Sequence, residues 1–434
     1  MKALVVGSGG REHCLMWKLS LNPAVKDLYC APGNAGTSFI GKNVPLDTID
    51  DIVRFACKES IDLTVVGPEA PLAEGIVDRL SEQGCKVIGP KQSEARLESS
   101  KIFAKNFMRR NNIPTADYEV FHHPNRAAAY IHSLREFPVV MKADGLAAGK
   151  GVAIVDDRDD ALLILRSLMV ERKFGKAGEK IVIEEFLSGE EATIILALDD
   201  DSFCLLPSSQ DHKKVGEGDI GPNTGGMGAY SPAPIVTAKQ TEKIEQKIVL
   251  PLVEGLKKEG MLYKGFLYIG IIVSDEGEPF VLEFNVRLGD PETQVVIPRL
   301  ENDLLEMFNA IIEGELHAIK VQVDPRPMLG VVMAAHGYPG NYERGMEISG
   351  LERFSNSSMD DVLIFHAGTK RKEGKVIANG GRVLNVCGKG NTLREAMDKV
   401  YKAMKYVHFA SGFYRHDIGF HALTEEFSHS TKKH

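Results

Sequence analysis

The chain has 434 residues, 43% of them hydrophobic, and its 52 basic and 60 acidic side chains leave a formal net charge of -8. That length suggests about two to four domains, and the negative charge argues against nucleic acid or an anionic membrane as a partner, because both attract positive surfaces. There is no long apolar run and no leader-like segment before the first strand, and the six cysteines lack C-x-x-C spacing, so we expect a cytoplasmic protein with free thiols.

Residues 1–100 alternate short apolar strands with helices. Strands are predicted at 3–7, 61–67 and 86–89, and the amphipathic segment DTIDDIVRFACKES carries helix-capping residues at its start. This alternation predicts a parallel, doubly wound sheet. A single long helix is predicted from about Ser93 to Arg110.

The middle of the chain has a different pattern. Residues 115–195 read as antiparallel strands with one or two helices, which is typical of a small α+β lid. Further strands follow up to residue 300, flanked by helices predicted at 237–259 and 292–314. After the proline-rich stretch 323–327, a predicted linker, more strands and an amphipathic helix at 392–408 indicate a last domain.

The segment GSGGREH (7–13) follows a strand and opens a helix. Glycines there let the backbone approach a phosphate, and a helix N-terminus supplies N–H groups and partial positive charge. The dinucleotide fingerprint G-x-G-x-x-G is incomplete, because Glu12 stands where its third glycine belongs, and this disfavours NAD binding. A cradle for a substrate phosphate and a plain tight turn are the two interpretations left.

The segment KADGLAAGKGV (142–152) is more informative. Lys142 ends an apolar strand, which holds its amine near a fixed point. The three glycines that follow indicate a loop whose N–H groups can fold over phosphates, and a lysine adds charge inside that loop. The alternative is a glycine-rich hairpin with solvated lysines.

The segment KIVIEEFLSGEEAT (180–193) places acids directly after an apolar strand. Backbone groups of such a strand can bind an adenine edge, and a carboxylate a few residues later can hold ribose hydroxyls. Exposed glutamates at a strand end are usually just solvated, so this segment by itself is weak evidence.

The segment PFVLEFNVRLGDPETQ (279–294) is the strongest local constellation. Glu283, Asn285 and Arg287 share one face of an extended strand, with Val281 predicted on the same face and the residues between them on an apolar one. Burying a carboxylate, an amide and a guanidinium together is costly unless they bind something. Oxygen ligands suit Mg²⁺, and an arginine beside that metal can hold charge on a transferring phosphoryl group. The alternative is a structural ion-pair cluster.

Residues 208–232 (SSQDHKKVGEGDIGPNTGGMGAYSP) are polar and rich in glycine. The stretch is too long to be an idle connection in a compact domain, so we expect a functional loop. Asp211, His212 and Lys213 offer charge, while residues 223–228 offer backbone N–H groups. A mobile surface loop without function is the alternative.

These motifs make the chain resemble the phosphoribosylamine–glycine ligases, an ATP-grasp family also called glycinamide ribonucleotide synthetases. The resemblance covers nearly the whole length, and RLGDPE is its most diagnostic part. The motifs are GREH (10–13), APGNAGT (31–37), VGPEAPL (66–72), KADGLAAGKGV (142–152), QDHK (210–213), GPNTGGMGAYSP (221–232), RLGDPETQ (287–294), HAGTK (366–370) and NGGRVL (379–384).

The resemblance implies an ATP-grasp fold that combines α/β and α+β parts. We expect an N-terminal Rossmann-like parallel-sheet domain at 1–100 and an ATP-grasp domain at 101–320 with a mobile lid at about 115–190. A small C-terminal α/β domain at 321–425 and a disordered tail at 426–434 complete the expected chain, which we expect to be a monomer.

The resemblance also implies roles for individual residues. ATP-binding residues are expected at Lys101, Lys142, Gly145, Gly149, Lys150, Gly151, Glu184, Glu185, Phe186, Leu187 and Glu191. Substrate-binding residues are expected at Gly9, Gly10, Asn223, Thr224, Gly225, Gly226, Met227, Gly228, Asp290 and Glu292. Catalytic roles fall to Arg287, Asp211 and Lys213, and the ligands of Mg²⁺ or Mn²⁺ are Glu283 and Asn285. Many members of the superfamily carry another metal-binding acid on the preceding strand, where GFLYIGIIVSD has none before Asp275, so the number of metal ions stays open.

The implied reaction converts ATP, glycine and 5-phosphoribosylamine to ADP, phosphate and glycinamide ribonucleotide, in de novo purine biosynthesis. Phosphoryl transfer to the glycine carboxylate makes an acyl phosphate that the amine attacks, and a glycine-hinged lid excludes water. The rival interpretations are an ATP-grasp ligase with a different carboxylate or amine, a non-catalytic nucleotide-binding regulator, and an NAD-dependent oxidoreductase.

Overall fold

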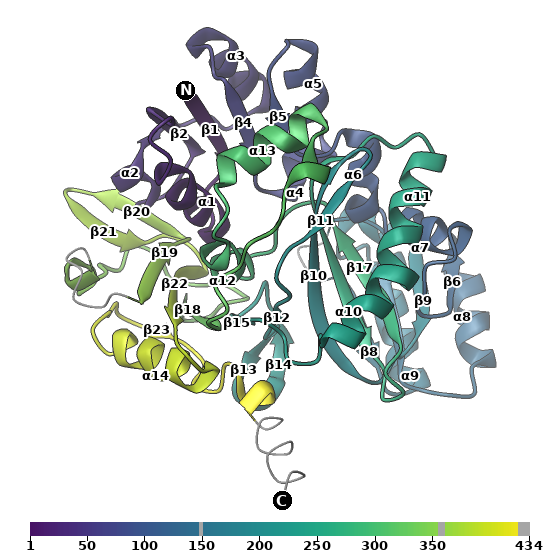
Figure 1. The fold of residues 1–434 in the computed structure, drawn as a ribbon. Helices are drawn as coiled ribbons and strands as arrows, with labels where there is room; N and C mark the ends of the chain where they lie inside the picture. Colours follow the sequence, from purple (N-terminus) through teal and green to yellow (C-terminus); the bar gives the residue numbers. More distant parts are fainter. Residues whose placement is uncertain (147–150, 355–360, 424–434) are drawn as a thin grey trace, which may run out of the picture.

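The computed structural model describes residues 1–146, 151–354 and 361–423. Within these ranges the chain forms four sheets of at least four strands and two separate hairpins (Figure 1). None of the described helices is long and apolar enough to cross a membrane.

The N-terminal sheet has the strand order β3-β2-β1-β4-β5, and every neighbouring pair is parallel. This confirms the predicted doubly wound sheet. Its strands are β1 (Lys2–Gly7), β2 (Asp27–Pro32), β3 (Lys42–Asn43), β4 (Leu63–Val66) and β5 (Val87–Ile88). Its helices are α1 (Gly10–Ser20), α2 (Thr37–Ile40), α3 (Ile49–Glu59), α4 (Glu69–Ala73), α5 (Ile76–Glu82) and α6 (Gln92–Ser99). Because parallel strands end at one edge, the turns after β1 and β4 open toward the same side.

The predicted single helix from Ser93 to Arg110 is wrong, because α6 ends at Ser99 and a new helix, α7 (Lys101–Arg110), follows. Ser100 between them is extended, with φ -138° and ψ 109°. Its hydroxyl accepts a hydrogen bond from Phe103 N at 3.1 Å, which caps α7. The hydroxyl also donates to Asp144 Oδ1 at 2.9 Å, so the break is tied to the start of the glycine-rich loop.

The lid is a four-stranded antiparallel sheet in the order β6-β9-β7-β8, with a hydrophobic core of its own. This agrees with the strand–loop–strand interpretation around Lys142. The elements are β6 (Tyr118–Phe121), α8 (Pro124–Ser133), β7 (Val139–Ala143), β8 (Val152–Val155), α9 (Arg158–Leu165) and β9 (Ile181–Glu185).

The central sheet is antiparallel, in the order β11-β10-β16-β17. Its strands are β10 (Glu190–Asp199), β11 (Phe203–Leu205), β16 (Lys264–Val273) and β17 (Pro279–Asn285). The helix predicted at 237–259 is present as α10 (Ala238–Ile244) and α11 (Leu250–Lys258), joined by a π-helical turn. The one predicted at 292–314 is wrong as a single helix. It divides into α12 (Thr293–Val296) and α13 (Leu304–Glu313), since Pro298 interrupts the first and Asp303 caps the second.

The register of β17 shifts by one residue where it passes β16. Gly270 pairs with Glu283 but Ile271 pairs with Val281, so Leu282 is an extra residue in the strand. Val281 is therefore buried in the same core as Phe284, and its predicted place on the polar face is wrong. The face shared by Glu283 and Asn285 lies beyond the shift and keeps the predicted period.

The C-terminal sheet runs β12-β15-β18-β22-β19, with β23 beside β18. The stretch 208–232, predicted as a long loop, is mostly strand, because β12 and β15 extend this sheet and β13–β14 form a hairpin between them. In Figure 1 these teal strands lie beside the yellow-green ones from the end of the chain. The elements are β12 (Gln210–Asp211), β13 (Lys214–Gly216), β14 (Ile220–Asn223), β15 (Gly228–Ser231), β18 (Met328–Ala335), β19 (Val362–His366), β20 (Thr369–Lys372), β21 (Lys375–Ala378), β22 (Arg382–Lys389), α14 (Leu393–Met404) and β23 (Gly412–Phe413).

Candidate active site

The three polar residues of the EFNVR segment lie together at the end of β17. Asn285 hydrogen-bonds the carboxylate of Glu283, and its Oδ1 accepts a hydrogen bond from Arg287 Nη2 at 3.1 Å. The amide of Asn285 thus links the carboxylate and the guanidinium, which places all three side chains in one polar cluster.

Two glutamates from the N-terminal part of the chain hold Arg287. Its Nη2 lies 3.0 Å from Glu98 Oε1, and its Nε lies 3.3 Å from Glu69 Oε2. Burial opposes the charge of Arg287, but Glu98 and Glu69 outweigh it and hold the pKa of the guanidinium above its ordinary range. Burial also raises the pKa of Glu98, to about 7. Neither glutamate was predicted. Glu69 lies within the motif VGPEAPL, whereas nothing in the sequence distinguishes Glu98 from an acid on an exposed helix face.

A second cluster pairs two lysines with one buried glutamate. Lys142 Nζ and Lys105 Nζ lie 2.9 and 3.0 Å from Glu184 Oε2. Lys142 also donates to the carbonyl of Leu282, at 3.2 Å, next to Glu283. Burial lowers the pKa of Lys105 to about 8. Glu184 Oε1 is buried without a hydrogen-bond partner among the described residues, so it can accept an N–H from a ligand.

Lys101 and the glycine-rich loop meet at the start of α7. Lys101 Nζ donates to the carbonyl of Gly145 at 3.1 Å, and the carbonyl of Gly151 accepts from Ala143 N at 2.9 Å. Lys105, which was not predicted, follows Lys101 by one helical turn, and that i, i+4 spacing was the signal for it. Two predicted residues lie outside the described residues: Gly149 and Lys150.

The connection from the lid to the central sheet contains the predicted adenine-lining residues. Glu185 exchanges two hydrogen bonds with Asp117, one through its own N–H and one through its carboxylate, each 3.0 Å long. Phe186 is 42% exposed, and Leu187 is half-buried. Glu191, at the start of β10, lies with its Oε2 2.7 Å from Lys213 Nζ.

Lys213 joins several acids of the site. Its Nζ also lies 3.8 Å from Asp211 Oδ1. Burial opposes the charge of Lys213, but Asp211 and Glu191 outweigh it and raise the pKa of the amine well above its ordinary value. Burial raises the pKa of Asp211, and burial together with the charge of Asp211 raises the pKa of Glu292 to about 7.

Glu283 stands within reach of the charge of three lysines. Burial raises the pKa of Glu283, but Lys213, Lys142 and Lys101 outweigh it, so the pKa is lower than usual and the carboxylate is ionised near neutral pH. A carboxylate and an amide oxygen suit a hard divalent cation, and the lysines suit the phosphates that accompany it. Opposite Glu283 and Asn285, strand β16 presents only Gly270 and Tyr268. The donor set therefore fits a divalent metal ion together with nucleotide phosphates.

The glycine turn before α1 is closed by carboxylates of the protein itself. Gly9 N donates to Glu12 at 2.5 Å, and Arg11 N donates to Asp290 Oδ2 at 3.2 Å. A Cβ on Gly10 would lie 2.4 Å from Gln294 Nε2, so a larger residue there would have to displace the amide of Gln294. The predicted substrate residues Gly9, Gly10 and Asp290 are thus in contact, and a ligand phosphate at this helix start would replace a carboxylate.

The predicted residues 223–228 form a tight turn held by Arg382 of β22. Arg382 Nη1 donates to the carbonyls of Gly225 and Asp290, at 2.6 and 2.5 Å. Gly226 has φ +112°, and a Cβ there would lie 2.4 Å from Pro291. Arg382 lies in the motif NGGRVL (379–384), but the sequence predicted no role for this arginine. It joins the turn to the RLGDPE segment.

The other residues of this turn pack on the QDHK segment. Thr224 donates to the carbonyl of Lys213 through both its backbone N–H and its hydroxyl, at 2.7 and 2.9 Å. Met227 N donates to the carbonyl of His212, at 2.8 Å, and the carbonyl of Gly228 accepts from His212 N, at 2.9 Å. Asn223 pairs with Lys214 across the β13–β14 hairpin. The two motifs are thus one structural unit.

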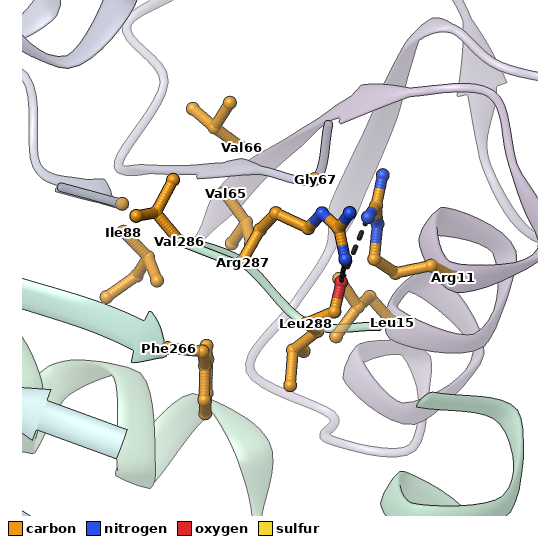
Figure 2. A pocket seen from close by; sticks show the side chains of 11 residues that line it. Arg11, Leu15, Val65, Val66, Gly67, Ile88, Phe266, Val286, Arg287 and Leu288 are labelled. Carbon is orange, nitrogen blue, oxygen red and sulfur yellow. Dashed lines mark hydrogen bonds between the residues drawn. The ribbon is translucent and has the colours of Figure 1, made fainter. Parts of the chain in front are cut away.

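A narrow pocket lies between the N-terminal sheet and the central sheet. Figure 2 shows Arg11 and Arg287 pointing toward the same carbonyl, that of Leu288, which accepts from both at 2.9 and 3.4 Å. Val66 and Phe266 contribute to its apolar lining. Arg11, from GREH, and Arg287, from the RLGDPE segment, thus fasten the two sheets together beside the site.

The motif GREH also meets the motifs APGNAGT and HAGTK behind the glycine turn. Asn34 Nδ2 donates to the carbonyls of Ser8 and His366, at 2.9 and 2.8 Å, and His366 N donates to His13 Nδ1 at 2.8 Å. Burial lowers the pKa of both histidines, that of His366 to about 4. The motifs GREH, APGNAGT and HAGTK therefore join the N-terminal sheet to the C-terminal sheet.

An antiparallel lid that carries buried lysines, next to a central antiparallel sheet that ends in a carboxylate and an amide, is the arrangement of an ATP-grasp protein. Solved structures share the fold: the biotin carboxylase domain of the 2-oxoglutarate carboxylase of Hydrogenobacter thermophilus is similar with a TM-score of 0.73 and 15% identity, over 95% of this chain and 91% of that one. Family models for phosphoribosylglycinamide synthetase match in three parts, the N domain at residues 1–98, the ATP-grasp (A) domain at 99–293 and the C domain at 328–421. The chain belongs to this family.

Curated relatives and a crystal structure agree with this assignment. The phosphoribosylamine–glycine ligase of Allochromatium vinosum is 48% identical over 98% of this chain and 100% of its own length. That of Vibrio vulnificus strain CMCP6 is 45% identical over 98% of this chain and 99% of its own length. The crystal structure of phosphoribosylamine–glycine ligase from Thermotoga maritima has a TM-score of 0.82 and 37% identity, and covers 96% of this chain and 100% of that one.

Proposed function

We propose that this protein joins glycine to 5-phosphoribosylamine in an ATP-driven reaction that gives glycinamide ribonucleotide, ADP and phosphate, in de novo purine biosynthesis. The observation that carries the proposal is the convergence of Glu283 and Asn285 with Lys142, Lys101 and Lys213, in a chain of this family. The oxygens suit a metal ion, and the amines suit the phosphates of ATP.

ATP binds, in this proposal, between the lid and the central sheet. Lys142 and Lys105, which neutralise Glu184 in the structure, turn toward the nucleotide phosphates, and Glu184 Oε1 accepts an N–H of the base. The backbone of Glu185 to Leu187 lines the adenine. The carboxylate of Glu191, which pairs with Lys213 in the structure, accepts hydrogen bonds from the ribose hydroxyls when ATP is bound. The loop that contains Gly145 and Gly151 covers the phosphates and excludes water.

The chemistry begins with a carboxylate, which is a poor electrophile because its negative charge repels an amine. Transfer of the γ-phosphoryl group to glycine gives glycyl phosphate, which has a good leaving group. Mg²⁺ or Mn²⁺ held by Glu283 and Asn285 would offset the charge of the phosphoryl oxygens. Arg287 and Lys213 supply fixed positive charge beside them.

The amine substrate occupies the surface formed by the glycine turn, the turn at residues 223–228 and Asp290. Arg382 holds the turn at residues 223–228 and Asp290 together through hydrogen bonds to Gly225 and Asp290. The groups that bind this substrate therefore come from the N-terminal, central and C-terminal parts of the chain. Once bound, the amine attacks the acyl carbon and phosphate leaves. No covalent enzyme intermediate is required, so the side chains act by positioning the reactants and by offsetting charge.

A direct test measures ADP release by the purified protein with ATP, Mg²⁺, glycine and 5-phosphoribosylamine, and identifies the product by mass. ADP should form only when both glycine and the amine are present. Release of ADP that persists with another amino acid in place of glycine, and not with glycine, would support the rival ATP-grasp ligase. An oxidoreductase is not favoured, because Glu12 stands where the third glycine of a dinucleotide-binding turn belongs and the chain belongs to the phosphoribosylglycinamide synthetase family.

We further propose that the enzyme acts in the cytoplasm as a monomer, with no nucleic acid or membrane as a partner. The net charge of -8 supports this, since it leaves no overall attraction to anionic polymers or lipids. Light scattering of the purified protein tests the mass of 47.6 kDa expected for one chain.

A further inference from the structure

His212 separates two residues of the site but points away from it. Asp211, at the end of β12, and Lys213 contribute to the acid and amine cluster around Glu283, whereas the side chain of His212 between them contacts the end of the described chain. His212 is 2% exposed, and its Nε2 accepts a hydrogen bond from Gly419 N at 3.0 Å. Its contacts therefore come from the end of the described chain.

The segment that receives His212 runs from Arg415 to His421, and we name it the C-terminal clasp. Arg415 is 1% exposed and donates to the carbonyl of Lys214, next to Lys213, at 3.0 Å. Its guanidinium also holds Asp219 at 2.7 Å and Asp417 at 2.8 Å. Asp417 accepts from Gly218 N, at 2.7 Å, so the clasp holds strand β13 and the tip of the β13–β14 hairpin.

The clasp is itself anchored to the C-terminal helix α14. The hydroxyl of Tyr401 donates to the carbonyl of Arg415, at 2.9 Å, and accepts from Ile418 N, at 3.2 Å. His421 adds a contact to Asp219 at 2.8 Å and stacks on His212 with a centroid distance of 5.6 Å. A chain of hydrogen bonds thus leads from α14 to the backbone beside Lys213.

The same side chains do not form a metal centre. His212, Asp219 and His421 place their ligand atoms within 4.8 Å of one another. However, His212 Nε2 already accepts from Gly419, and the Arg415 guanidinium already supplies the cation beside Asp219. The cluster is therefore structural, and the guanidinium of Arg415 takes the place that a metal cation would have beside Asp219.

We propose that the C-terminal clasp sets the position of Asp211 and Lys213 for the ligase reaction, with His212 and Arg415 as positioning residues. The proposal rests on the proposed function of the site. Both side chains are buried, and Arg415 holds the carbonyl of Lys214, so their effect passes through the segment 211–214 that carries the two site residues. A shift of that segment by about 1 Å is enough to cost up to roughly 100-fold in rate.

The first test compares His212→Leu with His212→Gln. Leucine removes the acceptor for Gly419 N, whereas the glutamine oxygen can reach the place of Nε2. We expect His212→Leu to lower kcat by between about tenfold and 100-fold. The KM for ATP should stay within about twofold of the wild type, because Lys142 and Lys105 lie elsewhere and the charge of Lys213 acts on the phosphoryl group in transfer. His212→Gln should recover most of the lost kcat.

The second test uses Arg415→Lys, with Arg326→Lys as its matched control. Arg326 also binds two aspartates in the C-terminal part of the chain, Asp324 and Asp361, but from the linker before β18. Lysine at 415 keeps a charge but cannot reach Lys214 and both aspartates together. We expect kcat to fall in Arg415→Lys and to stay at the wild-type value in Arg326→Lys.

Stability and local exchange distinguish positioning from unfolding. Thermal melting identifies a variant that fails to fold, and hydrogen exchange of the peptide spanning 209–231 reports on the hairpin without any turnover. Faster exchange confined to that peptide, with lower kcat and unchanged KM for ATP, supports the clasp. Wild-type kcat in both His212→Leu and Arg415→Lys would overturn it. If the wild type itself turns over no glycine, the proposed function fails, while the exchange result still decides whether the clasp orders the hairpin.

Discussion

At the scale of single residues, the site is organised by charges that are balanced in pairs and triads. Glu184 neutralises Lys142 and Lys105, Glu98 and Glu69 neutralise Arg287, and Glu191 neutralises Lys213. Glu283 differs from these acids, because Lys213 and Lys142, which lower its pKa most, are paired with other carboxylates, and Lys101 donates to the carbonyl of Gly145. Its negative charge is therefore available to a cation from solution.

Glu283→Gln tests this reading most directly. Glutamine keeps the size and one oxygen but loses the charge, so ADP formation should fall on the order of 100-fold, as when one electrostatic contact to a transition state is lost. The control is Glu278→Gln, which removes an acid at the other end of β17 that pairs only with Lys243 and Lys247. The measurements are the rate of ADP release and the melting temperature of each variant. Near-normal turnover in a folded Glu283→Gln protein would contradict the assignment of Glu283 as a metal ligand.

His366 makes a prediction about acid stability. Burial lowers its pKa from 6.5 to about 4 in the folded protein, so between those values the unfolded chain binds more protons than the folded one. The stabilising contribution is therefore complete above pH 6.5 and is lost as pH falls toward 4. The melting temperature of His366→Gln should fall less between about pH 7 and pH 5 than that of the wild type. The exposed His317→Gln should follow the wild type, and equal slopes for all three proteins would refute the burial argument.

At the scale of elements, the break between α6 and α7 matters because it joins the lid to the rest of the chain. Ser100 caps α7, and Asp144 accepts from both Ser100 Oγ and Ile102 N. One short break thus fixes the root of the glycine-rich loop and points Lys101 at it.

Ser100→Ala should therefore destabilise the protein. Loss of a serine N-cap costs about 1 kcal/mol, and here it also removes the hydroxyl that Asp144 binds. Ser99→Ala, one residue earlier and inside α6, is the control and should cost less than about 0.5 kcal/mol. Urea unfolding followed by circular dichroism measures both. Equal losses would mean that the cap contributes nothing beyond a surface substitution.

At the scale of the whole molecule, the C-terminal sheet is built from two distant parts of the chain. Strands β12 and β15 precede the central strands β16 and β17 in sequence but join the sheet of β18 and β22, where β15 pairs with β18. The QDHK segment and the turn at 223–228 are thereby fixed to the last part of the chain. Arg382 extends this link to the RLGDPE segment.

Arg382→Gln should weaken binding of the amine substrate more than binding of ATP. The change removes a charged donor to two carbonyls, an effect of roughly tenfold in affinity, while the lysines around Glu184 are untouched. The KM for the amine should rise about tenfold and the KM for ATP should stay constant. Arg371→Gln, on the separate hairpin β20–β21, is the control. A higher KM for ATP with an unchanged KM for the amine would contradict the proposed place of the amine.

Much of the fold follows from short-range patterns. Alternation of strands and helices in residues 1–100 predicts the parallel sheet, and period two in EFNVR predicts the common face of Glu283 and Asn285. The errors occur where a distant partner decides the local structure. The break at Ser100 depends on Asp144, and the shift at Leu282 depends on pairing with β16.

The sequence by itself determined the membership of the family, the doubly wound sheet, and the side chains suited to bind metal and phosphate, because these depend on residue types and short spacings. Only the tertiary structure decided which charges face one another: Glu98 with Arg287, Lys105 with Glu184, and Arg415 with the backbone beside Lys213. Such pairs join residues far apart in the chain, and an ion pair depends on distance and burial in space. No local pattern of residues encodes either quantity.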